Sequence, residues 1–157
     1  MYGCGLSIQI KISAPAIHKE SRSQTCMAVA SQFRSNYLHM EIKETHEQVG
    51  SIGYTVVDDT PVGKSVHLGY FTYPEFWGKG YTSEALGKVL EYAFTEDNVY
   101  RVTTGCLKEN AGSERVMQKN GMIKEAEHVD YEWHDGRIKT RLEYRLLKKE
   151  WERGKEQ

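Results

Sequence analysis

The sequence predicts a mixed α/β domain whose sheet is mainly antiparallel, and three observations support this fold class. The chain has 157 residues, which is the usual length of one folded domain. Hydrophobic residues make up 39% of it and aromatic residues 11%, enough for a packed core. Its apolar patterns follow the order strand, helix, three strands, helix, strand, helix and two strands, without a repeat or linker. We therefore expect a single domain over residues 1–157.

The N-terminal part is expected to hold two strands and one helix. Strict alternation of apolar and polar residues predicts a first strand over residues 6–12. Ser13 and Pro15 resemble an N-cap and a first-turn proline, so a weakly patterned helix follows and extends to Phe33. The alternation of Leu38, Met40 and Ile42 with polar residues predicts the second strand.

The middle of the chain is expected to form a hairpin and then a helix. A third strand covers residues 49–57, turn-forming residues occupy 58–63, and a fourth strand over 66–72 stops at Pro74. The helix begins after Gly80. Its apolar face is predicted from six residues at helical spacing: Ala85, Leu86, Val89, Leu90, Ala93 and Phe94.

The C-terminal part is expected to be a strand, a short helix and a hairpin. The fifth strand covers residues 99–107, and the helix over 113–119 stops at Asn120 and Gly121. Asp135 and Gly136 predict a type I′ turn between the last two strands, 122–134 and 137–146. In the last strand the basic residues are expected to form a solvated face, and the charged tail from Lys148 is expected to fray.

Charge and cysteine content exclude several classes of protein. A formal net charge of −1 argues against a partner that is a nucleic acid or an anionic membrane. No apolar run approaches the roughly 20 residues of a membrane span, and the first residues do not resemble a secretory signal. Cys4, Cys26 and Cys106 form no CxxC pair, which favours reduced thiols in a cytoplasmic protein. His46-Glu47 lacks the second histidine of a zinc motif, so we expect no metal.

The segment between the fourth strand and the following helix indicates an anion site. Gly78 and Gly80 allow a sharp turn and a close approach of the backbone to a ligand. The free amides of the first helical turn then point outward, and the helix dipole favours an anion there. The segment is neither a Walker A loop nor a GxGxxG fingerprint, and in isolation it would be a plain tight turn. Its place between a strand and an amphipathic helix favours a phosphate cradle.

These residues, with four further blocks, resemble the GNAT N-acyltransferases, in the branch that includes the RimJ and RimL protein N-terminal acetyltransferases. The family's pyrophosphate loop reads Q/R-x-x-G-x-G/A. Here Gly80 matches it, whereas Trp77 and Thr82 depart from it. The likeness covers about residues 49–151. Its other blocks are Asn110-Ala111-Gly112-Ser113, Lys119-Asn120-Gly121-Met122, residues 131–136 and Tyr144 with Glu150-Trp151.

The resemblance implies the GNAT fold, in which the fourth and fifth strands splay apart, and it implies acetyl-CoA as acyl donor. The pantetheine arm would lie in the gap, along the edge formed by Tyr70, Phe71 and Thr72. The pyrophosphate would be held by the loop amides of Gly78, Lys79, Gly80, Tyr81, Thr82 and Ser83. Asn110 would hold the pantetheine or the thioester end, although asparagine also serves as an ordinary helix cap.

Acyl transfer also needs an oxyanion donor, a base for the amine and an acid for the thiolate. The amide of Phe71 or of a neighbour is the candidate oxyanion donor. Many family members have a tyrosine acid where this chain has Met117, so Ser113 is the candidate acid, with a solvated first-turn serine as the alternative. His67 and Glu132 are the candidate bases. A surface histidine and a cross-strand ion pair are their respective alternatives.

We expect transfer of acetyl from acetyl-CoA to a primary amine, most simply a peptide or protein N-terminus. The alternatives are a small amine, such as a polyamine or aminoglycoside, and a catalytically silent acyl-CoA-binding protein. The family usually places two helices between the first two strands, and residues 13–35 have room for about one. This shortened region would leave the acceptor site open, or a partner subunit in a homodimer would complete it, or the chain is a shortened member.

Overall fold

The computed structural model describes residues 8–11 and 35–156. The predicted helix over 13–33, together with Cys4 and Cys26, lies outside these residues. The described strands are β1 (Ile8–Lys11), β2 (Ser35–Ile42), β3 (Gln48–Thr60), β4 (Gly63–Thr72), β5 (Val99–Leu107), β6 (Ile123–His134) and β7 (Arg137–Leu147). The described helices are η1 (Pro74–Phe76, one 3₁₀ turn), α2 (Tyr81–Thr95), α3 (Ala111–Lys119) and α4 (Lys148–Lys155).

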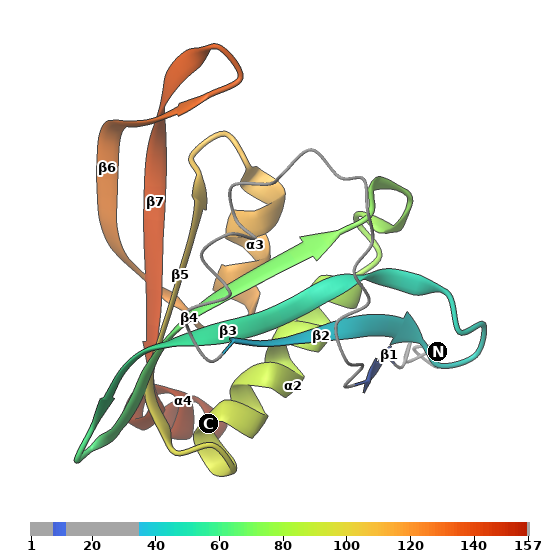
Figure 1. Cartoon of the computed structure of the whole chain (residues 1–157), viewed down its shortest axis with the longest axis vertical. Coiled ribbons are helices and arrows are strands. Elements are labelled where there is room, and N and C mark those ends of the chain that lie inside the picture. The colour runs from blue at the N-terminus through green and yellow to red at the C-terminus, as the bar shows by residue number, and fades with distance from the viewer. Residues whose placement is uncertain (1–7, 12–34, 157) are drawn as a thin grey trace.

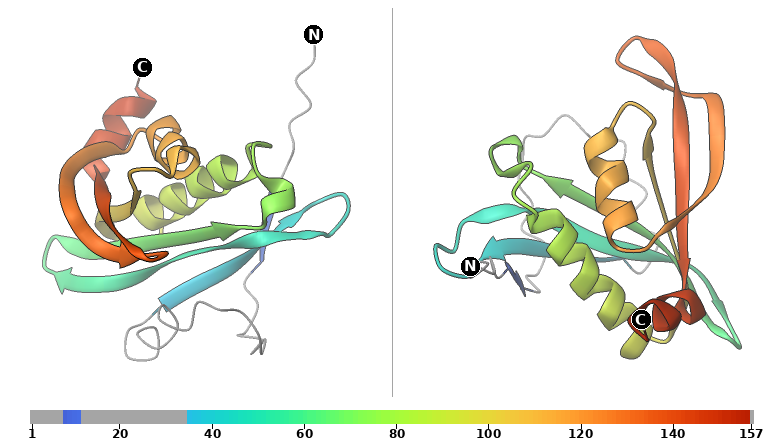
Figure 2. Two further views of the ribbon diagram at one scale, coloured as in Figure 1. Left: turned by 90° about the horizontal axis from the view of Figure 1, so that it is seen from above. Right: turned by 180° about the vertical axis from the view of Figure 1, so that it is seen from behind.

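In the described part of the chain these strands form one sheet in the order β1-β2-β3-β4-β5-β7-β6. Every neighbouring pair is antiparallel except β4 and β5, which run parallel. Helices α2, α3 and α4 all lie on one side of the sheet (Figures 1 and 2). The predicted fold class, a mixed and mainly antiparallel sheet with flanking helices, is therefore confirmed.

The parallel pair β4–β5 is paired along only part of its length. The register runs from Lys64↔Val99 to His67↔Thr103, yet β4 continues to Thr72 and β5 to Leu107. Beyond that last pair the two strands separate, which confirms the predicted splay. We call this space between the strands the opening.

A partly buried polar cluster lies at the paired end of β4 and β5, away from the opening. The hydroxyl of Tyr54 donates to Asp97 at 2.7 Å, and the ammonium of Lys64 donates to the same carboxylate at 2.6 Å. Burial, and then the hydrogen bond to Asp97, raise the pKa of Tyr54, so the phenol stays protonated. This cluster connects β3 and β4 to the segment that follows α2.

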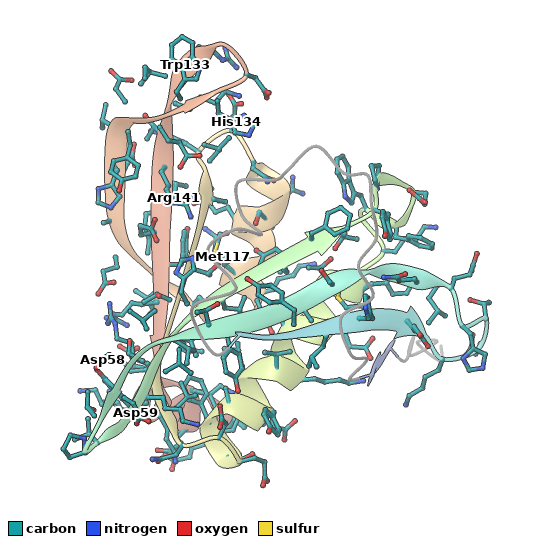
Figure 3. The ribbon with its side chains drawn as sticks, in the orientation of Figure 1. Asp58, Asp59, Met117, Trp133, His134 and Arg141 are labelled. Carbon is teal, nitrogen blue, oxygen red and sulfur yellow. The ribbon has the colours of Figure 1, made fainter. Side chains whose placement is uncertain are left out.

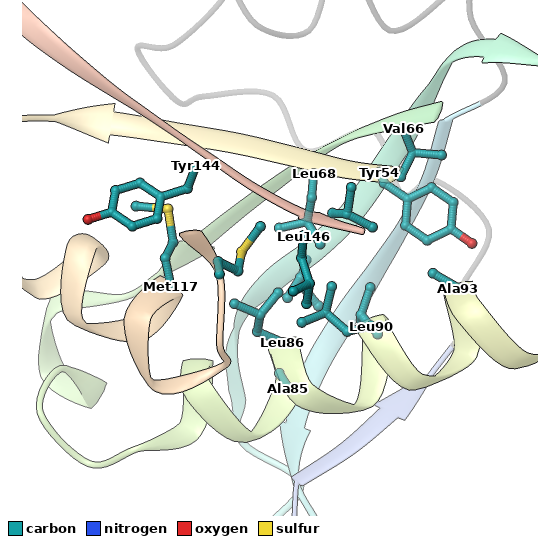
Figure 4. Packing of buried hydrophobic residues seen from close by; sticks show 14 of the residues in the cluster. Tyr54, Val66, Leu68, Ala85, Leu86, Leu90, Ala93, Met117, Tyr144 and Leu146 are labelled. Atoms are coloured by element: carbon teal, nitrogen blue, oxygen red, sulfur yellow. The ribbon is translucent and has the colours of Figure 1, made fainter. Parts of the chain in front are cut away.

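The core lies between the sheet and α2 (Figure 4). The predicted apolar face of α2 is buried in full, from Ala85 to Phe94, with Tyr81 added to it. It forms one apolar cluster with Val66 and Leu68 of β4, which are both buried. Met117 of α3 is also fully buried and lies beside Tyr144, so this side chain belongs to the core.

The turn predicted over residues 58–63 is wrong, because the observed turn is shorter. Asp58 and Asp59 are strand residues that pair with Ser65 and Lys64, at the far end of the β3–β4 hairpin (Figure 3). Only Pro61 and Val62 form the turn. The ladder continues because a bulge after Val56 keeps the two strands in register through residues that usually favour turns.

The β6–β7 hairpin has the predicted turn but not the predicted solvated basic face. Asp135 and Gly136 have φ of 51° and 78°, as a type I′ turn requires. The basic residues of β7 are ion-paired with carboxylates of β6, of β7 itself, of α4 and of the loop before α3. The pairs are Arg137 and Lys139 with Glu109, Arg141 with Glu132 and Glu143, and Arg145 with Glu125 and Glu150.

The tail from Lys148 is a helix, so the expectation that it frays is wrong. The Glu150 carboxylate accepts from the Leu147 amide at 3.0 Å and from the Arg145 guanidinium, and both bonds stabilise the start of α4. The Trp151 ring lies 5.4 Å from the buried ring of Phe94. In the described part of the chain, no helix has both the length and the apolar character needed to cross a bilayer.

Candidate active site

A pocket of about 310 Å³ lies where the N-terminus of α2 faces α3. Five residues of the predicted cofactor loop line it, namely Gly78, Gly80, Tyr81, Thr82 and Ser83. On the opposite wall are Gly112, Arg115, Val116 and Lys119 of α3, and Phe76 closes one side. The structure therefore places the predicted loop around a hollow of the size that a ligand needs.

The backbone of the loop is arranged to expose its amides. Gly78 and Gly80 have φ of 72° and 83°, conformations that a side chain strains. A Cβ atom at either glycine would meet nothing within 4 Å. The first helical bond of α2 is the Glu84 amide to the Gly80 carbonyl, and no side chain caps this end. The amides of the first turn precede that bond and remain available to an anion.

Three hydrogen bonds hold this loop in place. The Trp77 indole donates to the Thr72 carbonyl at 2.8 Å, which gives the tryptophan that replaces the family's Gln/Arg a bracing role. The hydroxyls of Thr72 and Thr82 lie 2.5 Å apart and join the end of β4 to the start of α2. The Asn120 amide group donates to the Ser83 carbonyl at 3.1 Å and thereby fixes α3 against α2.

Arg115 and Lys119 were not predicted as site residues, although they supply the positive charge of the pocket. They stand four residues apart on α3 and so share one face of the helix. The signal was present as an i, i+4 pair of cations downstream of the Asn110 block. Lys79, which was predicted, is absent from the lining, and its ammonium lies 5.4 Å from the centre of the Phe76 ring.

The backbone of β4 alternates between its two neighbouring strands. The Tyr73 amide donates to Val49 of β3 at 2.9 Å, and the Phe71 carbonyl also faces β3, at Gly50. Since successive residues of a strand direct their backbone groups to opposite sides, those of Tyr70 and Thr72 face the opening. Among the predicted oxyanion donors, the geometry favours these neighbours of Phe71 over Phe71 itself.

Asn110 and Ser113 form the start of α3. The Asn110 side chain accepts from the Ser113 amide at 3.1 Å, which is the helix-cap alternative for this residue. The Ser113 hydroxyl lies 2.7 Å from that of Tyr70, whose side chain extends from β4 to α3. Burial raises the pKa of Tyr70 to about 12, and the hydrogen bond to Ser113 opposes this rise. Both hydroxyls are therefore protonated at neutral pH and can donate.

His67 lies on the other face of the sheet, at the last pair before the opening. Its Nδ1 is 3.3 Å from the Thr103 hydroxyl, which donates its one hydrogen to the Val66 carbonyl at 3.2 Å. The hydroxyl therefore accepts from Nδ1, and Nε2 keeps its lone pair. Desolvation lowers the pKa of His67, while Glu143 raises it and Arg141 lowers it. The imidazole is thus neutral at pH 7 and can accept a proton.

Glu132 takes part in the cross-strand ion pair that was its alternative interpretation. Its carboxylate lies 3.2 Å from the Arg141 guanidinium. Arg141, labelled in Figure 3, also donates to Glu143 at 2.6 Å. Glu143 was not predicted, because in the sequence it is one more charge in an alternating strand. Within residues 8–11 and 35–156 no group of three metal-ligating side chains is placed to hold an ion.

Comparison with known proteins agrees with this geometry. Residues 11–123 match the family model described as an acetyltransferase (GNAT) domain. The chain belongs to the GNAT acetyltransferase family. Members of this family use acetyl-CoA as donor, and the exposed amides and two cations of the pocket suit its phosphates. The match identifies the family without assigning this GNAT chain to the RimJ and RimL branch.

Three relatives illustrate the range of this family. The uncharacterized N-acetyltransferase p20 of Bacillus licheniformis is 31% identical over 118 residues, covering 75% of this chain and 65% of that protein. A putative ribosomal N-acetyltransferase of Bacillus subtilis, YdaF, is 33% identical over 91 residues, covering 58% and 50%. The crystal structure of a GNAT acetyltransferase from Bacillus anthracis has a TM-score of 0.64 at 26% identity, covering 72% and 66%. The chain thus spans less than two thirds of these curated relatives.

Proposed function

We propose that this protein transfers acetyl from acetyl-CoA to a primary amine. One observation carries the proposal: the pocket of loop amides, Arg115 and Lys119 lies beside the end of β4, where the strands are splayed. An anionic donor held in this pocket can lay an extended arm along the opening, bonded to the backbone of Tyr70 and Thr72. Asn110, at the start of α3, would meet the inner part of that arm.

The residues beside the opening stand on opposite faces of the sheet, and this separation suits two proton transfers. The neutral Nε2 of His67 takes a proton from the amine on one face. The Ser113 hydroxyl, hydrogen-bonded to Tyr70, gives a proton to the departing thiolate on the other. A C–N bond forms and the C–S bond breaks between these two groups. Glu132 remains the alternative base, although its carboxylate is engaged by the Arg141 guanidinium at 3.2 Å.

The acceptor that we propose is a peptide or protein N-terminus. The near-neutral charge gives no long-range attraction for a polycation, and one relative is named as a putative ribosomal N-acetyltransferase. Such an acceptor would be the same class of substrate that the RimJ and RimL branch uses. A cytoplasmic location fits the acceptor, since such amines and acetyl-CoA are found there.

A rate panel tests this proposal. Thiol release at saturating acetyl-CoA would be compared for N-terminal peptides, spermidine and an aminoglycoside, with binding of acetyl-CoA measured separately by calorimetry. We expect the largest kcat/KM for a peptide. A larger value for spermidine or the aminoglycoside would replace the acceptor with a small amine. Tight binding without thiol release for any amine would identify a silent acyl-CoA-binding protein.

A further inference from the structure

Glycines occupy both sides of the opening on the face that carries His67. The last pair of β4 and β5 is His67↔Thr103, and the next residues on that face are Gly69 and Gly105, each two positions further on. Neither residue has a side chain to fill the first part of the opening. On this face, the positions beside the first part of the opening can therefore be reached only by side chains from other strands or by a ligand.

Two polar groups from other strands lie over these glycines. A Cβ atom at Gly69 would lie 3.2 Å from the hydroxyl oxygen of Tyr37 on β2. A Cβ atom at Gly105 would lie 2.9 Å from both carboxylate oxygens of Glu143, the residue paired with it on β7. Tyr37 and Glu143 thus border the opening from its two sides, and His67 stands at its closed end.

The charges around Glu143 leave one negative charge for a cation. Arg141 lies between two carboxylates, 2.6 Å from Glu143 and 3.2 Å from Glu132, so the three groups sum to −1. Arg145, the next cation on this face of β7, is paired with Glu125 and Glu150. The side chain of Glu143 is 25% exposed, so a ligand can reach it while much of it is shielded from water.

We propose that Glu143 is the residue that binds the acceptor as its ammonium ion. The inference rests on the proposed function and adds the group that recognises the substrate. The ammonium enters over Gly69 and Gly105, donates hydrogen bonds to Glu143 and the Tyr37 hydroxyl, and places one proton toward Nε2 of His67. His67 removes that proton, and the free amine then forms the C–N bond as the C–S bond breaks. The departing thiolate takes a proton from the Ser113 hydroxyl, and the acylated nitrogen gives its surplus proton to solvent, from which Ser113 is protonated again. Glu143 binds charge and His67 accepts the proton, so the two roles are separable.

The test compares Glu143→Gln with Glu127→Gln. Glutamine at 143 keeps an oxygen for Arg141 but removes the charge over Gly105. Glu127 is a matched control, because it is also an ion-paired carboxylate of the hairpin, 2.6 Å from Lys108, on the helix-covered face. For an alanyl hexapeptide we expect Glu143→Gln to raise KM by about 10- to 100-fold, the range of a lost charged hydrogen bond. Acetyl-CoA affinity and the kinetics of Glu127→Gln should change less than about twofold.

A second ligand separates recognition of charge from a structural effect. The same hexapeptide with a trimethylated N-terminus keeps the cation but has no proton to give. Its binding by calorimetry should weaken in Glu143→Gln, by less than KM rises because the trimethylated nitrogen loses only the charge attraction and no hydrogen bond, and should be unchanged in His67→Gln. A Glu143→Gln enzyme with normal peptide KM and normal binding of the trimethylated peptide would overturn the assignment. If the wild type acetylates no amine, the proposed function fails, and the trimethylated-peptide titration still decides the role of Glu143.

Discussion

The candidate sites on the two faces of the sheet differ in the groups that form them. On the face covered by α2 and α3, the candidate donor site consists of main-chain amides at glycines with positive φ, supported by Arg115 and Lys119. On the opposite face, the candidate acceptor site consists of side chains from separate strands, with His67 and Glu143 beside the opening. The first site is formed within one continuous segment and one helix, whereas the second depends on which strands are neighbours.

This difference has a consequence for specificity. We expect a site of main-chain amides to tolerate changes of side chain. Trp77, which replaces the family's Gln/Arg, is such a change, and its indole braces the loop through the Thr72 carbonyl. A site of side chains changes with each substitution. We therefore expect the donor to be common to the relatives and the acceptor to differ among them. Substitutions made on one face at a time test this contrast.

The largest effect is expected at Gly80. Glu at position 80 would place a negative charge beside the exposed amides, where a phosphate of the donor would bind, and like charges in contact cost several kcal/mol. We expect acetyl-CoA affinity by calorimetry to fall by about 10³-fold. Gly136→Glu is the control, since Gly136 also has a positive φ and open space but lies at the tip of the hairpin. Equal loss in both variants would show that the effect does not depend on a charge beside the loop amides, and would remove the loop from the donor site.

More of the candidate donor site than of the candidate acceptor site could be predicted from the sequence, for a physical reason. The loop from Gly78 to Ser83 and the apolar face of α2 are local patterns that one segment displays by itself. Arg115 and Lys119 were missed because their role depends on α3 packing beside α2. Glu143 was missed because only the pairing of β7 with β5 brings it over Gly105. Cross-strand neighbours are set by tertiary structure, and the alternation of charges along one strand does not reveal them.

The next largest effect is expected on the opposite face, at His67. His67→Gln removes the proton acceptor, and we expect kcat/KM to fall by about 10²-fold with unchanged acetyl-CoA affinity. Since desolvation keeps the pKa of His67 below 6.5, the wild-type rate should be full at pH 7 and fall as the pH decreases through that lowered pKa. The variant should lack this acid limb. If the wild type has no acid limb, or if the variant keeps the acid limb, His67 is not the base, and Glu132 or solvent takes the proton.

A smaller effect is expected from the cations of the pocket. Arg115→Gln and Lys119→Gln should each weaken acetyl-CoA binding by about tenfold and reduce its dependence on ionic strength. Arg153→Gln, which removes an exposed cation from α4, is the control and should leave both unchanged. Calorimetry at low and high salt gives both quantities. An unchanged salt dependence in the two pocket variants would show that these cations do not face the donor's phosphates.

The smallest effect is expected at Trp151, which is on the donor face but away from the pocket. The centre of its ring lies 5.4 Å from that of Phe94, and the Lys155 ammonium lies 4.4 Å from the centre of the Trp151 ring. The contact with Phe94 fixes α4 to the core. Because Trp151 is only partly buried, Trp151→Ala should cost about 2 kcal/mol of unfolding free energy, less than a fully buried tryptophan. Trp133→Ala is the matched control, since Trp133 is 69% exposed on β6, and it should cost under about 0.5 kcal/mol.

Denaturant titration measures the unfolding free energy of both variants. Acetyl-CoA affinity should be unchanged because no residue of α4 lines the pocket. A loss of affinity in Trp151→Ala at temperatures where the variant is folded would connect α4 to the donor site and weaken the contrast between the two faces.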